Sequence, residues 1–215
     1  KGADVRFSVN GEAVSLAWTD DSIPGVPAQS YYAVKTYEDG DKVNITAAAE
    51  GMKAVSSATV VPSRFPLTSI NFVLKGGEPN QLQFWIHFTD NAQTKDYYAL
   101  KVERKRQFWN DSKYSVENSS LTLNLDDEPL LNTSSGLDDI LMIENEFYRN
   151  LYYWDDTKIQ GKSYKVRLNT NYEADYEDDF ITPDGVEHIK CQVKYRISLY
   201  SLSEEFYRYL KSLND

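Results

Sequence analysis

Alternation of apolar and polar residues with a period of two most constrains how this chain can fold. In "LQFWIHF" every second residue from Leu82 to Phe88 is apolar, and Val5, Phe7 and Val9 repeat the pattern. Successive side chains of a strand point to opposite faces, so such runs place one face against a core. The sequence therefore predicts a mainly β protein.

Turn signals divide residues 1–62 into short strands. Asn10-Gly11 is the dipeptide favoured in two-residue hairpin turns, and Asp39-Gly40 and Glu50-Gly51 interrupt later runs. Short strands with a turn every 8–12 residues or so are typical of β-sandwiches. We therefore predict an immunoglobulin-like or fibronectin-like sandwich module over residues 1–62, ending at the stiff connector that begins with Pro62.

Residues 63–215 are expected to form a second antiparallel β domain. Strand patterns recur in "DYYALKVERKRQFW", in "SYKVRL" and in "CQVKYRISLYSL". Between them, residues 110–150 are rich in Asp, Asn and Ser, which predicts long loops.

The closing stretch "SEEFYRYLKSL" changes from a strand period to a helical one. Ser203 can cap a helix, and Phe206, Leu210 and Leu213 then lie on one stripe. We predict an amphipathic helix over residues 203–213 that covers part of the second sheet.

Composition excludes several classes of function. The 215 residues carry a formal net charge of −10, which argues against nucleic acid as a partner and against adsorption to anionic lipid. No apolar run approaches the roughly 18 residues that span a bilayer. No glycine-rich phosphate-binding loop or other cofactor motif is present, so we expect no cofactor.

The densest carboxylate cluster is "YEADYEDDF". Its side chains could hold calcium, which prefers oxygen ligands, but the spacing is not that of an EF-hand loop. A solvated acidic loop is the alternative. The calcium candidates are Asp175, Glu177, Asp178 and Asp179.

Catalytic arrangements are scarce. Cys191, the single cysteine, lies three residues from His188, and odd spacing on a strand sends the two side chains to opposite faces. We expect Cys191 to be a buried apolar residue and assign no catalytic residue.

Several aromatic residues could stack against a sugar or peptide ligand if they are exposed, or pack in the core if they are not. These residues are Trp85, Trp109, Tyr153 and Trp154.

Four segments in succession resemble a known family. They are "YEDGDKVNITAAAEGMKAVSSATVVP", "LQFWIHFTDNAQTKDYYALKVE", "WDDTKIQGKSYKVRL" and the closing "VKYRISLYSLSEEFYRYLKSLN". Over residues 3–214 their order is similar to that of a domain-of-unknown-function family of Bacteroidetes lipoproteins, often encoded beside TonB-dependent receptors.

The resemblance implies export and attachment to the outer membrane, on its periplasmic side or at the cell surface, through a lipidated cysteine expected upstream of Lys1. It implies no enzymatic activity. We expect a non-enzymatic accessory binding protein for TonB-dependent nutrient uptake, with a glycan or peptide ligand. A glycan- or peptide-acting hydrolase that uses the acidic stretch, and an adhesin or fibre subunit, are the alternatives.

Overall fold

The computed structural model describes residues 2–24, 26–75, 81–110, 113–131, 150–183 and 185–213. Contacts divide the chain into two compact units: Lys1–Arg64 with Ser203–Phe206, and Phe65–Leu202 with Tyr207–Asp215. Every strand pair among the described residues is antiparallel, and the prediction of a mainly β fold is confirmed.

The first unit contains two small sheets. The larger has the order β2-β1-β5-β6, with β1 (Asp4–Val9), β2 (Glu12–Val14), β5 (Lys42–Ala48) and β6 (Val55–Val60). The smaller pairs β3 (Ala17–Thr19) with β4 (Ser30–Tyr32).

The hairpin between β1 and β2 forms where the sequence predicts it. Asn10 and Gly11 both have positive φ, 52° and 85°, as a type I′ turn requires. Val9 is the one buried hydrophobic residue among the described residues of segment 1–64, so this unit has little core of its own.

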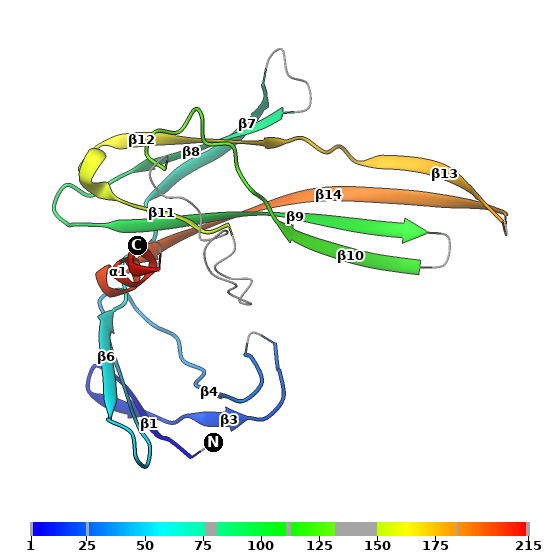
Figure 1. The fold of residues 1–215 in the computed structure, drawn as a ribbon. Helices are drawn as coiled ribbons and strands as arrows, with labels where there is room; N and C mark the ends of the chain where they lie inside the picture. The colour runs from blue at the N-terminus through cyan, green and yellow to red at the C-terminus, as the bar shows by residue number, and fades with distance from the viewer. Residues whose placement is uncertain are drawn as a thin grey trace. The chain divides into compact units, whose positions relative to one another are not determined.

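The second unit stacks two sheets (Figure 1). One has the order β12-β8-β7, with β7 (Leu67–Leu74), β8 (Gln81–Thr89) and β12 (Ser163–Asn171). The other has the order β10-β9-β14-β13, with β9 (Tyr97–Asn110), β10 (Lys113–Ser120), β13 (Tyr176–Thr182) and β14 (Gly185–Leu202). The short strand β11 (Tyr152–Asp155) also pairs with β9, and the 3-10 helix η1 (Asp156–Lys158) follows it.

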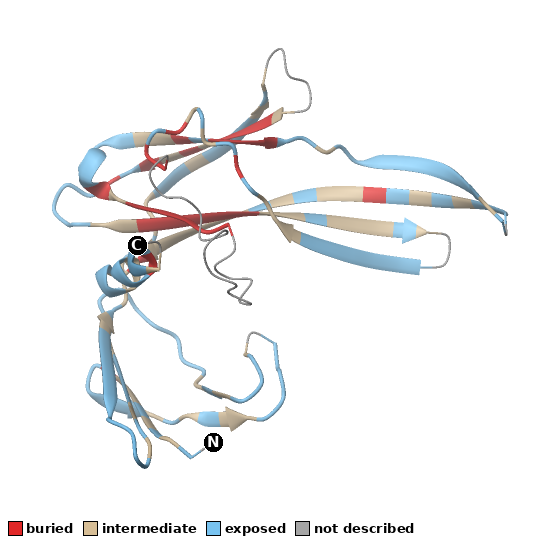
Figure 2. Ribbon diagram, in the orientation of Figure 1, coloured by how far each residue is buried: buried red, intermediate tan, exposed pale blue. Residues whose placement is uncertain are grey.

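The core lies where these two sheets overlap, as Figure 2 shows. The alternating residues of β8, from Leu82 to Phe88, are all at most 5% exposed. Val166 and Leu168 on the neighbouring strand β12 pair with Ile86 and Phe84 and are fully buried on the same side of the sheet. Beyond the overlap, β10, β13 and the first part of β14 continue as a largely exposed extension of one sheet (Figures 1 and 2).

Two stretches expected to be loops are strands instead. Residues 113–120, inside the segment 110–150, form β10, and the second half of the acidic stretch forms β13. Both are edge strands whose residues are almost all exposed, so they lack the apolar face by which a strand is recognised. Residues 132–149 of the expected loop segment lie outside the described residues.

The predicted C-terminal helix is confirmed as α1 (Glu204–Ser212). Ser203 Oγ accepts a hydrogen bond from Phe206 N at 3.3 Å, so Ser203 is the N-cap. Leu210 is fully buried, while Phe206 and Leu213 are half-buried. No helix among the described residues is long and apolar enough to span a bilayer.

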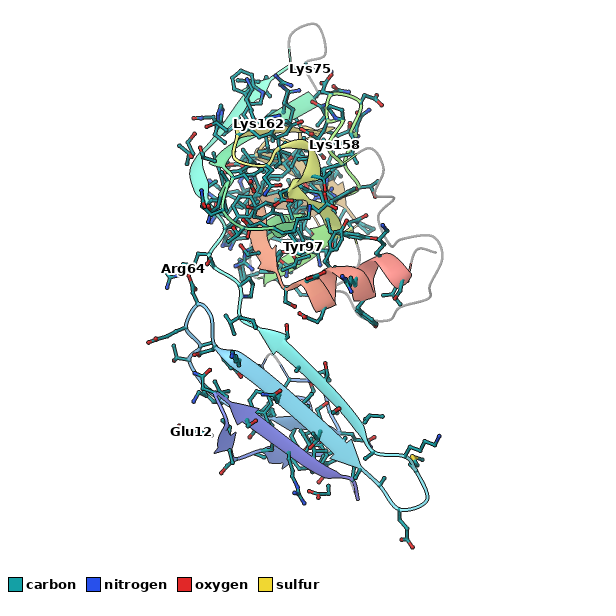
Figure 3. The ribbon with its side chains drawn as sticks, turned by 90° about the vertical axis from the view of Figure 1, so that its left-hand side faces the viewer. Glu12, Arg64, Lys75, Tyr97, Lys158 and Lys162 are labelled. Atoms are coloured by element: carbon teal, nitrogen blue, oxygen red, sulfur yellow. The ribbon has the colours of Figure 1, made fainter. Side chains whose placement is uncertain are left out.

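Aromatic side chains hold the second half of α1 in the second unit. The ring of Tyr207 lies 4.7 Å from that of Tyr97, which Figure 3 labels beside the helix. The hydroxyl of Tyr207 donates to Asp155 at 3.3 Å, and burial together with that carboxylate raises the pKa of Tyr207 to about 12. Tyr153 Oη donates to the carbonyl of Leu210 at 3.3 Å.

Candidate functional site

An open cleft of about 700 Å³ lies within the second unit, between the β7–β8 side of one sheet and β14 of the other. Its volume is in the range of small-molecule sites in proteins, about 300–1,000 Å³. Its lining is mainly apolar and aromatic, with two carboxylates from the segment that joins β12 to β13. The lining residues are Ile70, Phe72, Leu82, Phe84, Tyr172, Glu173, Ala174, Asp175, Val193, Tyr195 and Ile197.

The cleft lies where β7 carries core-facing residues that no other described residue covers fully. Phe72 pairs with the buried Phe84, and Ile70 pairs with the buried Ile86, so both point to the same side of the sheet as the core. Yet Phe72 is 70% exposed and Ile70 is 40% exposed. Uncovered apolar side chains that line a hollow mark a binding surface more often than isolated exposed residues do.

One wall of the cleft is held by an ion-pair network around Glu173. Arg106 donates to both oxygens of this carboxylate, from Nε at 2.7 Å and from Nη2 at 2.8 Å. Arg104 Nη1 lies 2.7 Å from Glu173 Oε2. The hydrogen bond from Arg106, with the charges of both arginines, holds the pKa of Glu173 below its ordinary value.

Backbone bonds fix the same wall. Glu173 N donates to Tyr195 Oη at 3.0 Å, and the ring of Tyr195 packs edge-on against Phe84 at 5.7 Å. Asp175 Oδ1 accepts from Val193 N at 2.7 Å. The carboxylates of the cleft therefore have protein partners, and the surface they present is preformed.

The four calcium candidates do not converge on one point. Asp175 bonds to β14, as described above, while Glu177 and Asp179 share a face of β13 and both bond to His188, at 3.0 and 2.7 Å. Asp178 lies on the opposite face and accepts a bond from Asp179 N. None of the four belongs to the one group of carboxylates that, among the described residues, lie close enough together to share an ion.

That group consists of Asp90, Asp96 and Asp156, whose oxygens lie within 4.8 Å of one another. Lys95 Nζ bonds to the fully buried Asp156, so an ammonium group already supplies positive charge here. Asp96 N donates to the other oxygen of Asp156 at 2.6 Å. The group is a structural link between the start of β9 and η1.

Asp90 extends this link to the turn after η1. Its carboxylate accepts from Tyr98 Oη at 2.7 Å and from Gly161 N at 2.7 Å. Gly161 has φ of 67°, and a Cβ there would lie 2.7 Å from the Cβ of Ala92, so the position requires glycine. Asp90 lies in "FTDN" and Asp156 in "WDDTKIQG". Both stretches belong to the segments that resemble the domain-of-unknown-function family, so part of the family resemblance rests on residues that join two turns.

The four candidate stacking residues lie in different surroundings. Tyr153 and Trp154 are buried, at 5% and 4% exposure, and serve packing. Trp85 is half-buried; its Nε1 donates to Gln83 Oε1, and Lys165 Nζ lies 4.4 Å from its ring centroid. Trp109, at 37% exposure, lies at the surface of the sheet extension.

The fold and the cleft define a two-unit antiparallel β protein with a preformed apolar surface in its second unit. Over residues 1–215 the chain matches the family described as "Domain of unknown function (DUF4249)", and it belongs to that family. No curated protein matches the sequence.

Proposed function

We propose that this chain is a non-enzymatic binding protein whose cleft between β7–β8 and β14 receives the apolar part of a ligand. The observation that carries the proposal is the row of uncovered core-facing side chains on β7, above all Phe72 at 70% exposure. Burying a side chain of this size against a ligand contributes about 1.5–3 kcal/mol, so the strand gains stability when a ligand is present.

The carboxylates of the cleft support binding over hydrolysis. A general acid at neutral pH needs a raised pKa, whereas the two arginines lower the pKa of Glu173. The second carboxylate, Asp175, is committed to a backbone N–H of β14. A rigid polar rim around an apolar hollow suits a ligand, glycan or peptide, that presents an apolar surface.

The cellular setting follows from the resemblance of the four segments. We propose an exported lipoprotein of Bacteroidetes type, held at the outer membrane by a lipid anchor upstream of this chain and acting beside a TonB-dependent receptor in nutrient uptake. The net charge of −10 agrees with a protein that does not adsorb to anionic lipid by itself.

The cleft is tested with a neutral fluorescent probe, 1-N-phenylnaphthylamine. Wild-type protein should bind it saturably, and Phe72→Ser should weaken binding about tenfold, which corresponds to about 1.4 kcal/mol. The matched control is Phe180→Ser, an exposed phenylalanine of β13 outside the cleft. Equal affinity of the two variants, or no binding by the wild type, would refute a site in this cleft.

The partner is tested separately. The protein, expressed with its native leader, should co-purify with a TonB-dependent receptor after extraction in a gentle detergent, and mass spectrometry identifies the receptor. Isolation of the protein without any such receptor would contradict the proposed setting while leaving the cleft result intact.

A further inference from the structure

Trp109 and Tyr114 form an exposed aromatic pair on the sheet extension of the second unit. They lie directly opposite each other on β9 and β10, with ring centroids 5.4 Å apart and planes inclined by 47°. Trp109 is 37% exposed and Tyr114 is 52% exposed. A cross-strand aromatic pair stabilises a hairpin, but here both rings also keep much of their surface in water.

Charged and polar groups continue the same face beside the rings. Trp109 pairs with Lys190 on β14, and Lys190 pairs with Glu177 on β13, so the three side chains form one row across the sheet. His188, two residues from Lys190, lies on the same face. The rings and these groups line a shallow hollow of about 470 Å³.

We propose that this face binds a neutral sugar ring, such as a pyranose unit of a polysaccharide, stacked on Trp109 and Tyr114. One face of a pyranose carries C–H groups with small positive partial charges, and the face of an aromatic ring carries negative charge. The hydroxyl groups at the edge of the sugar then contact the polar row, which consists of Glu177, His188 and Lys190. This site is separate from the cleft and does not depend on the function proposed for it.

The polar row offers hydrogen bonds rather than net charge. His188 bridges Glu177 and Asp179 at 3.0 and 2.7 Å, and Lys190 Nζ lies 3.7 Å from Glu177 Oε2. Two lysines, Lys113 and Lys190, line the hollow and offset the carboxylates of Glu177 and Asp179, so a charged ligand gains little. Each carboxylate oxygen has further lone pairs, and an ammonium has three donors, which suits hydroxyl groups that both donate and accept.

Tyr114 adds a directed donor. Its Oη accepts a hydrogen bond from Gln107 Nε2 at 2.7 Å, which leaves the hydroxyl hydrogen to donate to a ligand. The rings lie on the face of the sheet, whereas an extended peptide that adds a strand binds along an edge. The observations therefore favour a sugar over a peptide.

Affinity electrophoresis tests the proposal, with dextran, laminarin, xyloglucan or galactomannan in the gel. At least one of these neutral polysaccharides should retard the wild-type protein, and Trp109→Ala should weaken that binding at least tenfold. Phe180→Ala, which removes an exposed ring from the opposite face of the same sheet, is the control and should bind as the wild type does.

Two further measurements guard against a hairpin that unfolds in Trp109→Ala. Tyr114→Phe keeps the ring and should weaken binding about threefold through loss of the hydroxyl. In the wild type, a bound oligosaccharide of the retarding polysaccharide should reduce acrylamide quenching of tryptophan fluorescence. Phe72→Ser should retain full affinity, so that failure of this site and failure of the cleft are distinguishable.

The proposal is overturned if no polysaccharide retards the wild type. It is equally overturned if Trp109→Ala binds like Phe180→Ala, or if a mixture of casein peptides competes for the site and sugars do not.

Discussion

Truncation of Leu210 to alanine tests how α1 is attached to the second unit. Leu210 is the one fully buried side chain of the helix, and its carbonyl accepts the hydrogen bond from Tyr153. The neighbouring residues Tyr209 and Lys211 are exposed, so the helix is anchored mainly through this position and the ring of Tyr207.

The expected loss follows from the atoms removed. Leu→Ala deletes three carbon atoms, and at about 0.8 kcal/mol for each buried carbon the transfer contribution is about 2.4 kcal/mol. The cavity adds up to about 2 kcal/mol where the surroundings cannot relax. Because the helix is exposed on its outer side and ends two residues later, at Ser212, it can shift inward, and we expect a total of about 3 kcal/mol.

Urea unfolding followed by tryptophan fluorescence measures this loss. Trp85, Trp109 and Trp154 all belong to the second unit, so the signal mainly reports its unfolding. With a urea dependence of about 2 kcal/mol per molar, the midpoint should fall by about 1.5 M.

Leu74→Ala is the matched control, because Leu74 is 55% exposed on β7 and should lose less than about 1 kcal/mol. If the midpoint of Leu210→Ala moves no further than that of Leu74→Ala, α1 is not packed as described.

Three further predictions concern titratable groups. The pKa of Glu173 is held below its ordinary value of 4.5, so the ion pair stabilises the fold above pH 4.5 and this stability is lost as pH falls through the lowered pKa. The difference in urea midpoint between wild type and Glu173→Gln should therefore shrink from about pH 7 to about pH 3. A constant difference would contradict this. Hydrogen bonds that the His188 ring donates to Asp179 and then to Glu177 raise the pKa of His188 above 6.5. The stability that these bonds contribute is therefore lost as pH rises through that raised pKa. An NMR titration should give a midpoint above 6.5 that falls in Asp179→Asn, and an unchanged midpoint would exclude the bond. Burial raises the pKa of the Cys191 thiol, which should react with 5,5′-dithiobis(2-nitrobenzoate) only in urea; reaction of the native protein would show that the thiol is accessible.

The parts of the fold that were predicted are those whose side chains meet a core. Strand β8 alternates because one of its faces is buried under the second sheet, and α1 shows its helical period because Leu210 is buried. Asn10-Gly11 was recognisable because a local backbone conformation, with φ positive at both residues, selects those residue types. Burial and a positive φ both restrict which residue types occur at a position, so both can be recognised in the local sequence.

Strands β10 and β13 show no such restriction in their sequences. They pair with β9 and β14 through backbone hydrogen bonds, and nearly all of their side chains are exposed. Backbone pairing places no requirement on side chains that face water, so an acidic or Ser-rich stretch can form an edge strand as well as a loop. These two stretches are strands because they pair with β9 and β14.

The cleft could not be predicted for a related reason. Glu173 meets Arg106 across 67 positions of sequence, and neither residue shows locally that the other is near. In the sequence Phe72 alternates with Ile70 and Leu74 like a core residue of a strand, and only the structure shows that it is 70% exposed. Phe72 has the side chain and the strand position of a core residue but stays exposed, and for this reason we propose that a ligand covers it.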